Sequence, residues 1–308
     1  MPQPFLEFEQ VSKSFGRQEA LSAVSFEVGR GEIVGFVGPN GAGKSTAMRI
    51  LVGLLRPDRG AVRLAGLDQR AHPRRVRAQI GALIESPASY PGLTASDHLA
   101  YVGRLRGLRA VDPAQALRSV GLDPTSRKPV RQFSLGMKQR LGLAMATLGA
   151  PSLLVLDEPM NGLDPLGMAD LRDYLRRLPS RTGAGVLVSS HLLAEIEQVC
   201  DRVLLIRDGR LLAGTDMRGN AAERRTVLLR TSDDARAEEV LRKAAVAESL
   251  ELGPGGILCR LHAGAVGRLA TVLVGEGLEV HELTPRGLTL EDIYVATYGD
   301  EHNGRDLR

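Results

Sequence analysis

The sequence predicts an α/β protein with two domains, and three of its features lead to this prediction. A glycine-rich loop joins an apolar run at residues 33–37, typical of a buried strand, to a helical pattern at 47–55. A second apolar run, at 153–156, ends in two carboxylates. After a polar stretch at 215–223, strand and helix patterns begin again. We therefore expect a large domain with a mixed sheet, followed by a small α+β domain.

The large domain is expected at residues 1–215, with an antiparallel β subdomain and a helical subdomain at about 86–150. The accessory domain is expected at 216–299, where strand and helix patterns alternate without a catalytic set of residues. Its last predicted element is a helix at 289–298. Residues 300–308 are expected to form a disordered tail.

The composition limits the classes of function. No run of about 18 apolar residues is present and the first residues lack a signal-peptide pattern, so the chain is expected neither to span a membrane nor to be secreted. The formal charge is +4, but aromatic residues make up 4% and tryptophan is absent, which leaves no stacking platform for bases and disfavours nucleic acid as a partner. Cys200 and Cys259 are expected to be reduced, structural thiols.

Alternating apolar and polar residues at 5–11 and 24–28 predict two antiparallel strands ahead of the apolar strand at 33–37. Phe15 lies at the turn between them, where its ring could stack on a flat adenine. The alternative, that Phe15 packs under the strands, stays open.

The glycine-rich loop matches the P-loop pattern and adds a second threonine. Its residues are Gly38, Pro39, Asn40, Gly41, Ala42, Gly43, Lys44, Ser45 and Thr46. The glycines let successive backbone N–H groups converge, and the following helix adds the positive end of its dipole, so the loop is suited to a polyanion. We expect it to bind a nucleoside triphosphate, with Lys44 reaching the β- and γ-phosphates and the Ser45 hydroxyl binding Mg²⁺.

The strand expected at 80–84 ends in a carboxylate, Glu85. The following loop contains two prolines and a glycine, and the residues from Thr94 to Asp97 form a capping box that opens a helix at 95–106. A second helix is expected at 113–120. These helices make the segment a helical subdomain.

Further candidate residues lie beyond the helical segment. Ser134 is placed as the N-cap of a helix and, with Gly136, would form a second anion site, although a plain helix cap remains the alternative. The strand at 153–156 delivers Asp157 as a ligand of Mg²⁺ and Glu158 to orient or deprotonate the attacking water. His191 follows the strand at 185–189 and is expected to donate to the γ-phosphate rather than to serve the core.

These elements occur in the order and spacing found in ATP-binding-cassette (ABC) ATPases, a P-loop NTPase fold, which the chain resembles over about residues 5–215. In that family two such domains face each other head to tail and share two ATP molecules. The resemblance implies that Ser134 and Gly136 contact ATP held by the partner subunit and that Phe15 stacks on adenine. It also implies that Asp164 links the two sites. Glu85 takes the place of a glutamine that reports on Mg²⁺ and on the membrane partner, and its carboxylate can still bind Mg²⁺.

The motif that begins at Ser134 departs from the family's usual form, because Leu135 and Met137 replace a glycine and a glutamine. Segments 84–94 and 134–141 are similar to the bacitracin-resistance and lantibiotic-immunity branch of the drug-export ATPases, and 288–294 is similar to the C-terminal appendage of that group. The loop at 86–94 is expected to contact the permease because it is exposed and stiffened by proline.

The resemblance implies an ATP-hydrolysing subunit at the cytoplasmic face of the membrane, with ATP and Mg²⁺ as cofactors. It would power a separate permease that exports an antimicrobial peptide or an amphiphilic drug, paired with a second copy of itself or a homologous ATPase subunit. Two alternatives stay open: a soluble ABC ATPase that acts on nucleic acid or ribosomes, and an import ATPase.

Overall fold

The computed structural model describes residues 4–84, 89–216, 226–253, 255–262, 265–285 and 290. The chain divides into two compact units, residues 1–215 and 216–308. None of the helices in the described ranges is long and apolar enough to cross a lipid bilayer.

The first unit is built on a six-stranded sheet in the order β10-β9-β3-β8-β7-β6. From β9 to β6 the strands run parallel, and β10 returns along β9 through a tight turn at Asp208 and Gly209, which have φ values of 47° and 73°. Every residue of β3, β7 and β8 is buried, as in parallel sheets covered on both faces. The strands are β3 (Ile33–Val37), β6 (Ile80–Leu83), β7 (Leu153–Asp157), β8 (Gly185–Ser190), β9 (Arg202–Arg207) and β10 (Arg210–Asp216).

A second, antiparallel sheet has the order β2-β1-β4-β5. It consists of β1 (Leu6–Phe15), β2 (Gln18–Val28), β4 (Arg59–Leu64) and β5 (Leu67–Asp68). A row of rings joins it to the parallel sheet, since the centroids of Phe8 and Phe26 lie 4.7 Å apart and those of Phe26 and Phe36 lie 5.5 Å apart. The mixed sheet and the antiparallel β sheet predicted from the sequence are confirmed.

Helix α1 (Lys44–Leu51) begins inside the P-loop motif and ends earlier than the predicted limit of residue 55. Gly53 stops it, because its φ of 80° cannot continue a right-handed helix. The buried face of α1, with Met48 and Ile50, belongs to the core shared by the two sheets.

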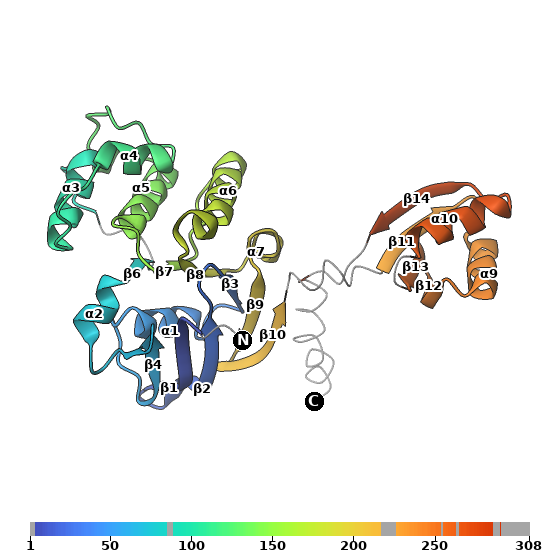
Figure 1. Ribbon diagram of the computed structural model, residues 1–308, viewed down its shortest axis with the longest axis horizontal. Coiled ribbons are helices and arrows are strands. Elements are labelled where there is room, and N and C mark those ends of the chain that lie inside the picture. The colour runs from blue at the N-terminus through green and yellow to red at the C-terminus, as the bar shows by residue number, and fades with distance from the viewer. Residues whose placement is uncertain are drawn as a thin grey trace, which may run out of the picture. The chain divides into compact units, whose positions relative to one another are not determined.

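Helices α3 (Ala95–Leu105), α4 (Pro113–Ser119) and α5 (Leu135–Thr147), with the 3₁₀ turn Val130–Gln132, lie together on the side of the parallel sheet away from the antiparallel sheet (Figure 1). The predicted caps are present: the Thr94 hydroxyl accepts the Asp97 N–H at 3.2 Å and the Ser134 hydroxyl accepts the Met137 N–H at 3.2 Å.

Three further helices, α2 (Pro73–Ala78), α6 (Pro165–Thr182) and α7 (Leu193–Val199), complete the unit. Of these, α6 is an 18-residue helix that the sequence analysis does not predict. Its signals are present, because Asp164 caps it, Pro165 opens it and Gly183 ends it with a φ of 69°. Most of its residues are polar, so the apolar residues do not show a clear helical spacing in the sequence.

The second unit contains one four-stranded antiparallel sheet in the order β12-β13-β11-β14. The chain order β-α-β-β-α-β with this strand order is the split βαβ arrangement. Strand β12 is not predicted from the sequence. The helix predicted at 289–298, apart from residue 290, and the tail predicted at 300–308 lie outside the described residues. The elements are β11 (Thr226–Thr231), α9 (Asp234–Ala244), β12 (Ala247–Gly253), β13 (Gly256–Leu261), α10 (Val266–Gly275) and β14 (Val280–Pro285).

Each unit buries one free cysteine, Cys200 in the first and Cys259 in the second. Burial raises the pKa of the Cys200 thiol far above its usual range, and it raises the pKa of Cys259 to about 12. Since the thiolate is the reactive form, both side chains are protected by their surroundings and by their protonation.

We expect the native protein at pH 8 to release no colour from Ellman's reagent within minutes, and both thiols to react once guanidinium unfolds the chain. Replacing one cysteine at a time by alanine assigns each reaction to one unit. Rapid reaction of either thiol in the native protein would contradict its burial.

Candidate functional site

The P-loop follows the end of β3, and at two of its positions there is room only for glycine. A Cβ atom at Gly38 would collide with the Ile206 carbonyl oxygen. Gly43 has a φ of 109°, and a Cβ there would lie 2.7 Å from the Ala20 carbonyl oxygen. The loop is therefore pressed against β2 and β9, and its backbone is held in one curved path.

The Lys44 ammonium lies inside this curve. Its Nζ donates to the Gly38 carbonyl at 2.6 Å and to the Pro39 carbonyl at 3.2 Å, and the residue is 6% exposed. Burial lowers the pKa of Lys44, while the carboxylates of Glu158 and Asp157 act in the opposite direction. A cavity of about 180 Å³ is lined by residues 39–46 and by Glu158, so the loop and this carboxylate face the same space.

The two carboxylates at the end of β7 are linked by a serine of the next strand. The Ser189 hydroxyl donates to Asp157 Oδ1 at 2.6 Å and accepts the Glu158 N–H at 2.9 Å. Ser189 of β8 lies directly opposite Asp157 of β7 in the pairing of these strands. Glu158 has a φ of 49°, an uncommon backbone conformation for a residue with a side chain. Ser189 thus fixes the direction in which both carboxylates leave the sheet.

His191 approaches the same carboxylate from the end of β8. Its Nδ1 lies 2.8 Å from Glu158 Oε2, and its backbone N–H donates to that oxygen at 3.4 Å. The Glu158 carboxylate is therefore held between His191 and the P-loop cavity. A carboxylate held at the edge of a phosphate-binding loop can position a water molecule and accept its proton.

Gln139 of α5 also reaches this region, although the sequence analysis does not identify it. Its Nε2 donates to the Pro159 carbonyl at 3.1 Å and to the Glu158 carbonyl at 3.4 Å. The residue is 7% exposed on a largely apolar helix. The signal for Gln139 was an amide side chain within a largely apolar helix, because a polar group buried there generally has a hydrogen-bond partner. Ser189 offered a similar signal, a hydroxyl at the end of a fully apolar strand.

The residues expected to contact a partner's ATP lie apart from the P-loop cavity. Ser134 caps α5 at its exposed end, and a Cβ at Gly136 would lie 3.3 Å from Leu163 Cδ2. The Asp164 carboxylate caps α6 by accepting the Gly167 N–H at 3.1 Å. The N-termini of α5 and α6 therefore meet around Leu163, and neither contributes to the cavity that Lys44 occupies.

Two other predicted site residues have separate positions. Phe15 is 49% exposed at the end of β1, with Lys13 Nζ 5.7 Å from the ring centroid, so the alternative that it packs under the strands is wrong. Glu85 lies outside the described residues.

A magnesium ion would find oxygen donors here. Ser45 lines the P-loop cavity, and the buried Asp157 carboxylate stands close enough to act on the charge of Lys44. Among the described residues no group of three or more His, Cys, Asp or Glu forms a protein cage for a metal. This donor set suits Mg²⁺, which usually takes one or two protein oxygens and completes its shell with phosphate and water.

A P-loop between β3 and α1, with carboxylates at the end of β7, a parallel strand separated from β3 by β8, defines the class of P-loop nucleotidases. The family described as ABC transporter matches residues 21–161. The ABC transporter ATP-binding protein YdbJ of Bacillus subtilis (strain 168) is 36% identical over 310 residues, covering 100% of each chain. The chain belongs to the ATP-binding proteins of the ABC transporter family and is an ATPase.

Other relatives carry names that include a transported compound. The bacitracin transport ATP-binding protein BcrA of Bacillus licheniformis is 35% identical over 94% of this chain and 95% of its own. The lantibiotic transport ATP-binding protein SrtF of Streptococcus pyogenes is 38% identical over 70% of this chain and 92% of its own.

Solved structures agree with the fold. The ATP-binding subunit of an ABC transporter is 34% identical, with a TM-score of 0.63 over 70% of this chain and 91% of that one. A dimeric ATP-binding cassette bound to ADP and Pi in a post-hydrolysis state has a TM-score of 0.64 over 70% of this chain and 99% of that one. At 23% identity, the latter supports the fold alone.

Replacing Ser189 with alanine should lower kcat of ATP hydrolysis about tenfold, the scale expected when a group that orients a reacting residue is lost. KM for ATP should change much less, because the P-loop backbone is untouched. Steady-state kinetics with a melting curve separates this from unfolding. Ser190→Ala is the matched control, since that hydroxyl accepts the Leu192 N–H and touches neither carboxylate. Equal kcat in the wild type and Ser189→Ala would disprove the positioning role.

Proposed function

We propose that this chain is the ATPase subunit that powers a separate membrane permease, which exports an antimicrobial peptide or an amphiphilic drug. The relatives named for bacitracin and lantibiotic transport support this substrate class, and the similarity to the bacitracin relative extends over 94% of the chain. The subunit would act at the cytoplasmic face of the membrane, where ATP is available. The permease residues would select the substrate.

The observation that carries the proposed reaction is the Glu158 carboxylate at the edge of the P-loop cavity. Glu158 would orient a water molecule for in-line attack on the γ-phosphate and accept its proton. His191 would keep that carboxylate in place through Nδ1 and present its other ring nitrogen toward the γ-phosphate. Lys44 would neutralise charge on the β- and γ-phosphates.

Mg²⁺ would supply charge neutralisation at the phosphates, held by the Ser45 hydroxyl and the Asp157 carboxylate. The Ser189 hydrogen bond to Asp157 Oδ1 leaves the other carboxylate oxygen for this purpose. The exposed ring of Phe15 would stack on the adenine. Glu85 would add a further oxygen near the metal, as the sequence analysis predicts.

The active unit would be a head-to-tail dimer with a second copy of this chain or a homologous subunit. Ser134 and Gly136 lie at the exposed start of α5, a position suited to an anion but away from the chain's own P-loop cavity. A phosphate of ATP bound to the P-loop of a partner subunit would provide the anion for this position. Asp164, at the start of α6 beside them, would then link the two ATP sites.

The permease contact is proposed at the loop of residues 86–94, of which 89–94 are described. Tyr90 exposes 57% of its surface there. The loop is anchored to α3, because the Tyr90 N–H donates to Nε2 of His98, a buried residue of that helix, at 2.8 Å. An anchored loop with an exposed ring is suited to receive a segment of another protein.

Replacing Glu158 with glutamine should slow ATP turnover at least ~100-fold, the scale of losing a general base, while ATP still binds. The amide keeps the size of the side chain and removes its proton affinity. Turnover is measured by phosphate release and binding by a fluorescent ATP analogue. Glu239→Gln, an exposed change on α9, is the control. Wild-type turnover in Glu158→Gln would refute the role of this carboxylate.

The transport proposal is tested by ATPase activity with and without the co-encoded membrane protein in lipid, in the presence and absence of bacitracin and nisin. We expect stimulation by the membrane protein and a further increase with a peptide. Activity that ignores the membrane protein but responds to DNA or ribosomes would instead support the nucleic-acid alternative. Dependence on an external binding protein would support import.

A further inference from the structure

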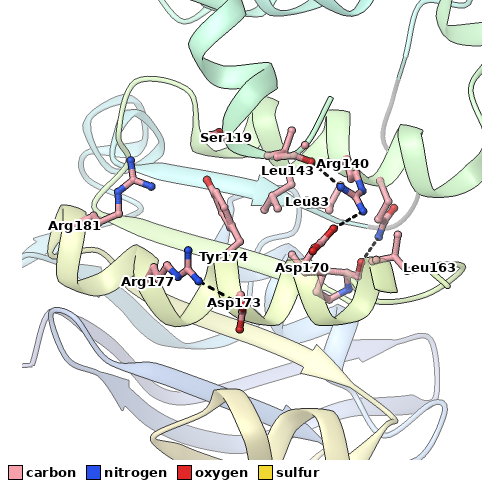
Figure 2. Close-up of a pocket in the computed structure, with 16 residues that line it drawn as sticks. Leu83, Ser119, Arg140, Leu143, Leu163, Asp170, Asp173, Tyr174, Arg177 and Arg181 are labelled. Carbon is pink, nitrogen blue, oxygen red and sulfur yellow. Dashed lines mark hydrogen bonds and ion pairs between the residues drawn. The ribbon is translucent and has the colours of Figure 1, made fainter. Parts of the chain in front are cut away.

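The first unit contains a larger cavity, of about 380 Å³, that is separate from the P-loop (Figure 2). Its size falls within the range of small-molecule sites. One wall is a single face of α6, and the opposite wall is formed by α5 and the end of α4. Among the α6 residues that line the cavity, Gly167, Asp170, Tyr174, Arg177 and Arg181 recur at every third or fourth position, and Leu171 and Asp173 lie between them.

The inner part of this cavity is apolar. Leu83 at the end of β6, Leu143 of α5 and Leu171 of α6 contribute side chains to it. Leu163, which lies in the sequence between the two carboxylates at the end of β7 and helix α6, adds a fourth side chain. A hydrocarbon chain or an aromatic ring could bury its surface against these leucines.

The mouth of the cavity carries excess positive charge, with three arginines against two aspartates. Arg140 is engaged, because its guanidinium binds Asp170 at 3.0 Å and the Val120 carbonyl at 3.3 Å. Arg177 makes only an exposed contact of 3.5 Å with Asp173, which is weak and easily exchanged.

The exposed Arg181 and the Tyr174 hydroxyl have no hydrogen bond or ion pair within the described part of the chain. Figure 2 shows Tyr174, Arg177 and Arg181 toward one end of the cavity and the Arg140–Asp170 pair at the other. Two guanidinium groups and a phenol at one end provide donors for a single anionic group. Arg181 is also the basic residue in the last turn of α6, where its charge offsets the helix dipole, whereas the exposed Arg176 lies a turn earlier and does not line the cavity.

The cavity also touches elements that position the candidate reacting groups. Helix α5 starts at Ser134 and α6 starts after Asp164, and both helices line the cavity. Gln139, another lining residue, holds the carbonyls of Glu158 and Pro159. A ligand wedged between α5 and α6 would therefore restrain the helix that carries Ser134.

We propose that the cavity between α5 and α6 binds a small amphiphilic anion, with its carboxylate or phosphate at Arg177, Arg181 and Tyr174 and its apolar body on the leucines. Occupancy lowers the rate of ATP hydrolysis by tying α5 to α6. The binding step stands on the cavity alone, whereas the effect on hydrolysis rests on the proposed function.

Equilibrium dialysis of the full chain with radiolabelled octanoate, without ATP, tests the binding step. We expect saturable binding that octanamide, the uncharged molecule of the same size, displaces at least about tenfold less effectively than unlabelled octanoate. Arg181→Ala should weaken octanoate binding about tenfold, since it removes a charge-assisted hydrogen bond, and Arg181→Lys should retain most of it. Ser119→Trp, at the exposed rim, should block the cavity.

Arg176→Ala is the matched control, because it removes the same charge from an exposed position of the same helix that does not line the cavity. Equal loss in Arg176→Ala and Arg181→Ala would overturn the site, as would equal displacement by octanamide or the lack of saturable binding. Glu158→Gln should bind octanoate with unchanged affinity, so binding is judged even if the proposed reaction is wrong. Octanoate should lower wild-type ATPase activity at least about twofold and leave Arg181→Ala less affected. Binding without this effect would overturn the regulatory step alone.

Discussion

The register of three neighbouring parallel strands determines where the candidate reacting groups lie. Val37, the last residue of β3 before the P-loop, pairs with Ser190, and Ser189 pairs with Asp157. The three strands therefore end level with one another, and their next residues enter the same space. A slip of one residue in β8 would turn Ser189 to the opposite face and move His191 away from Glu158. Every residue of β3, β7 and β8 is buried, so a shift of register would draw the polar residues that follow these strands into the core.

The site stores backbone strain that its surroundings must support. Glu158 has a φ of 49°, a conformation that costs a residue with a side chain about 1–3 kcal/mol. Ser189 binds its N–H and Gln139 approaches its carbonyl, so both backbone polar groups of Glu158 are engaged by side chains. His191 then binds the carboxylate. The turn directs Glu158 toward the P-loop instead of continuing along the strand, which an ordinary extended conformation would not achieve.

Local signals in the sequence were sufficient for the fold class and for most strands, since apolar runs, alternation and capping residues act over a few positions. They were insufficient where the stabilising contact joins distant parts of the chain. Helix α6 is polar over much of its length and is defined by its caps, while only Gly167, Leu171 and Leu175 of its residues are buried. Ser189 and Gln139 acquire their roles only when β8 and α5 meet the end of β7. The candidate roles of Ser134 and Gly136 depend on ATP bound to a second subunit, so neither the sequence nor the structure of one chain can test them.

The departure at Leu135 also has a local explanation. Its side chain occupies the space above Gly162, where even a Cβ atom would collide with it. Leu163 fills the neighbouring space beside Gly136. The start of α5 is thus packed against the segment that leads into Asp164, the residue that caps α6. A leucine at position 135 gives up the flexibility of glycine and gains this contact. The two helix starts therefore lie against each other through Leu135 and Leu163.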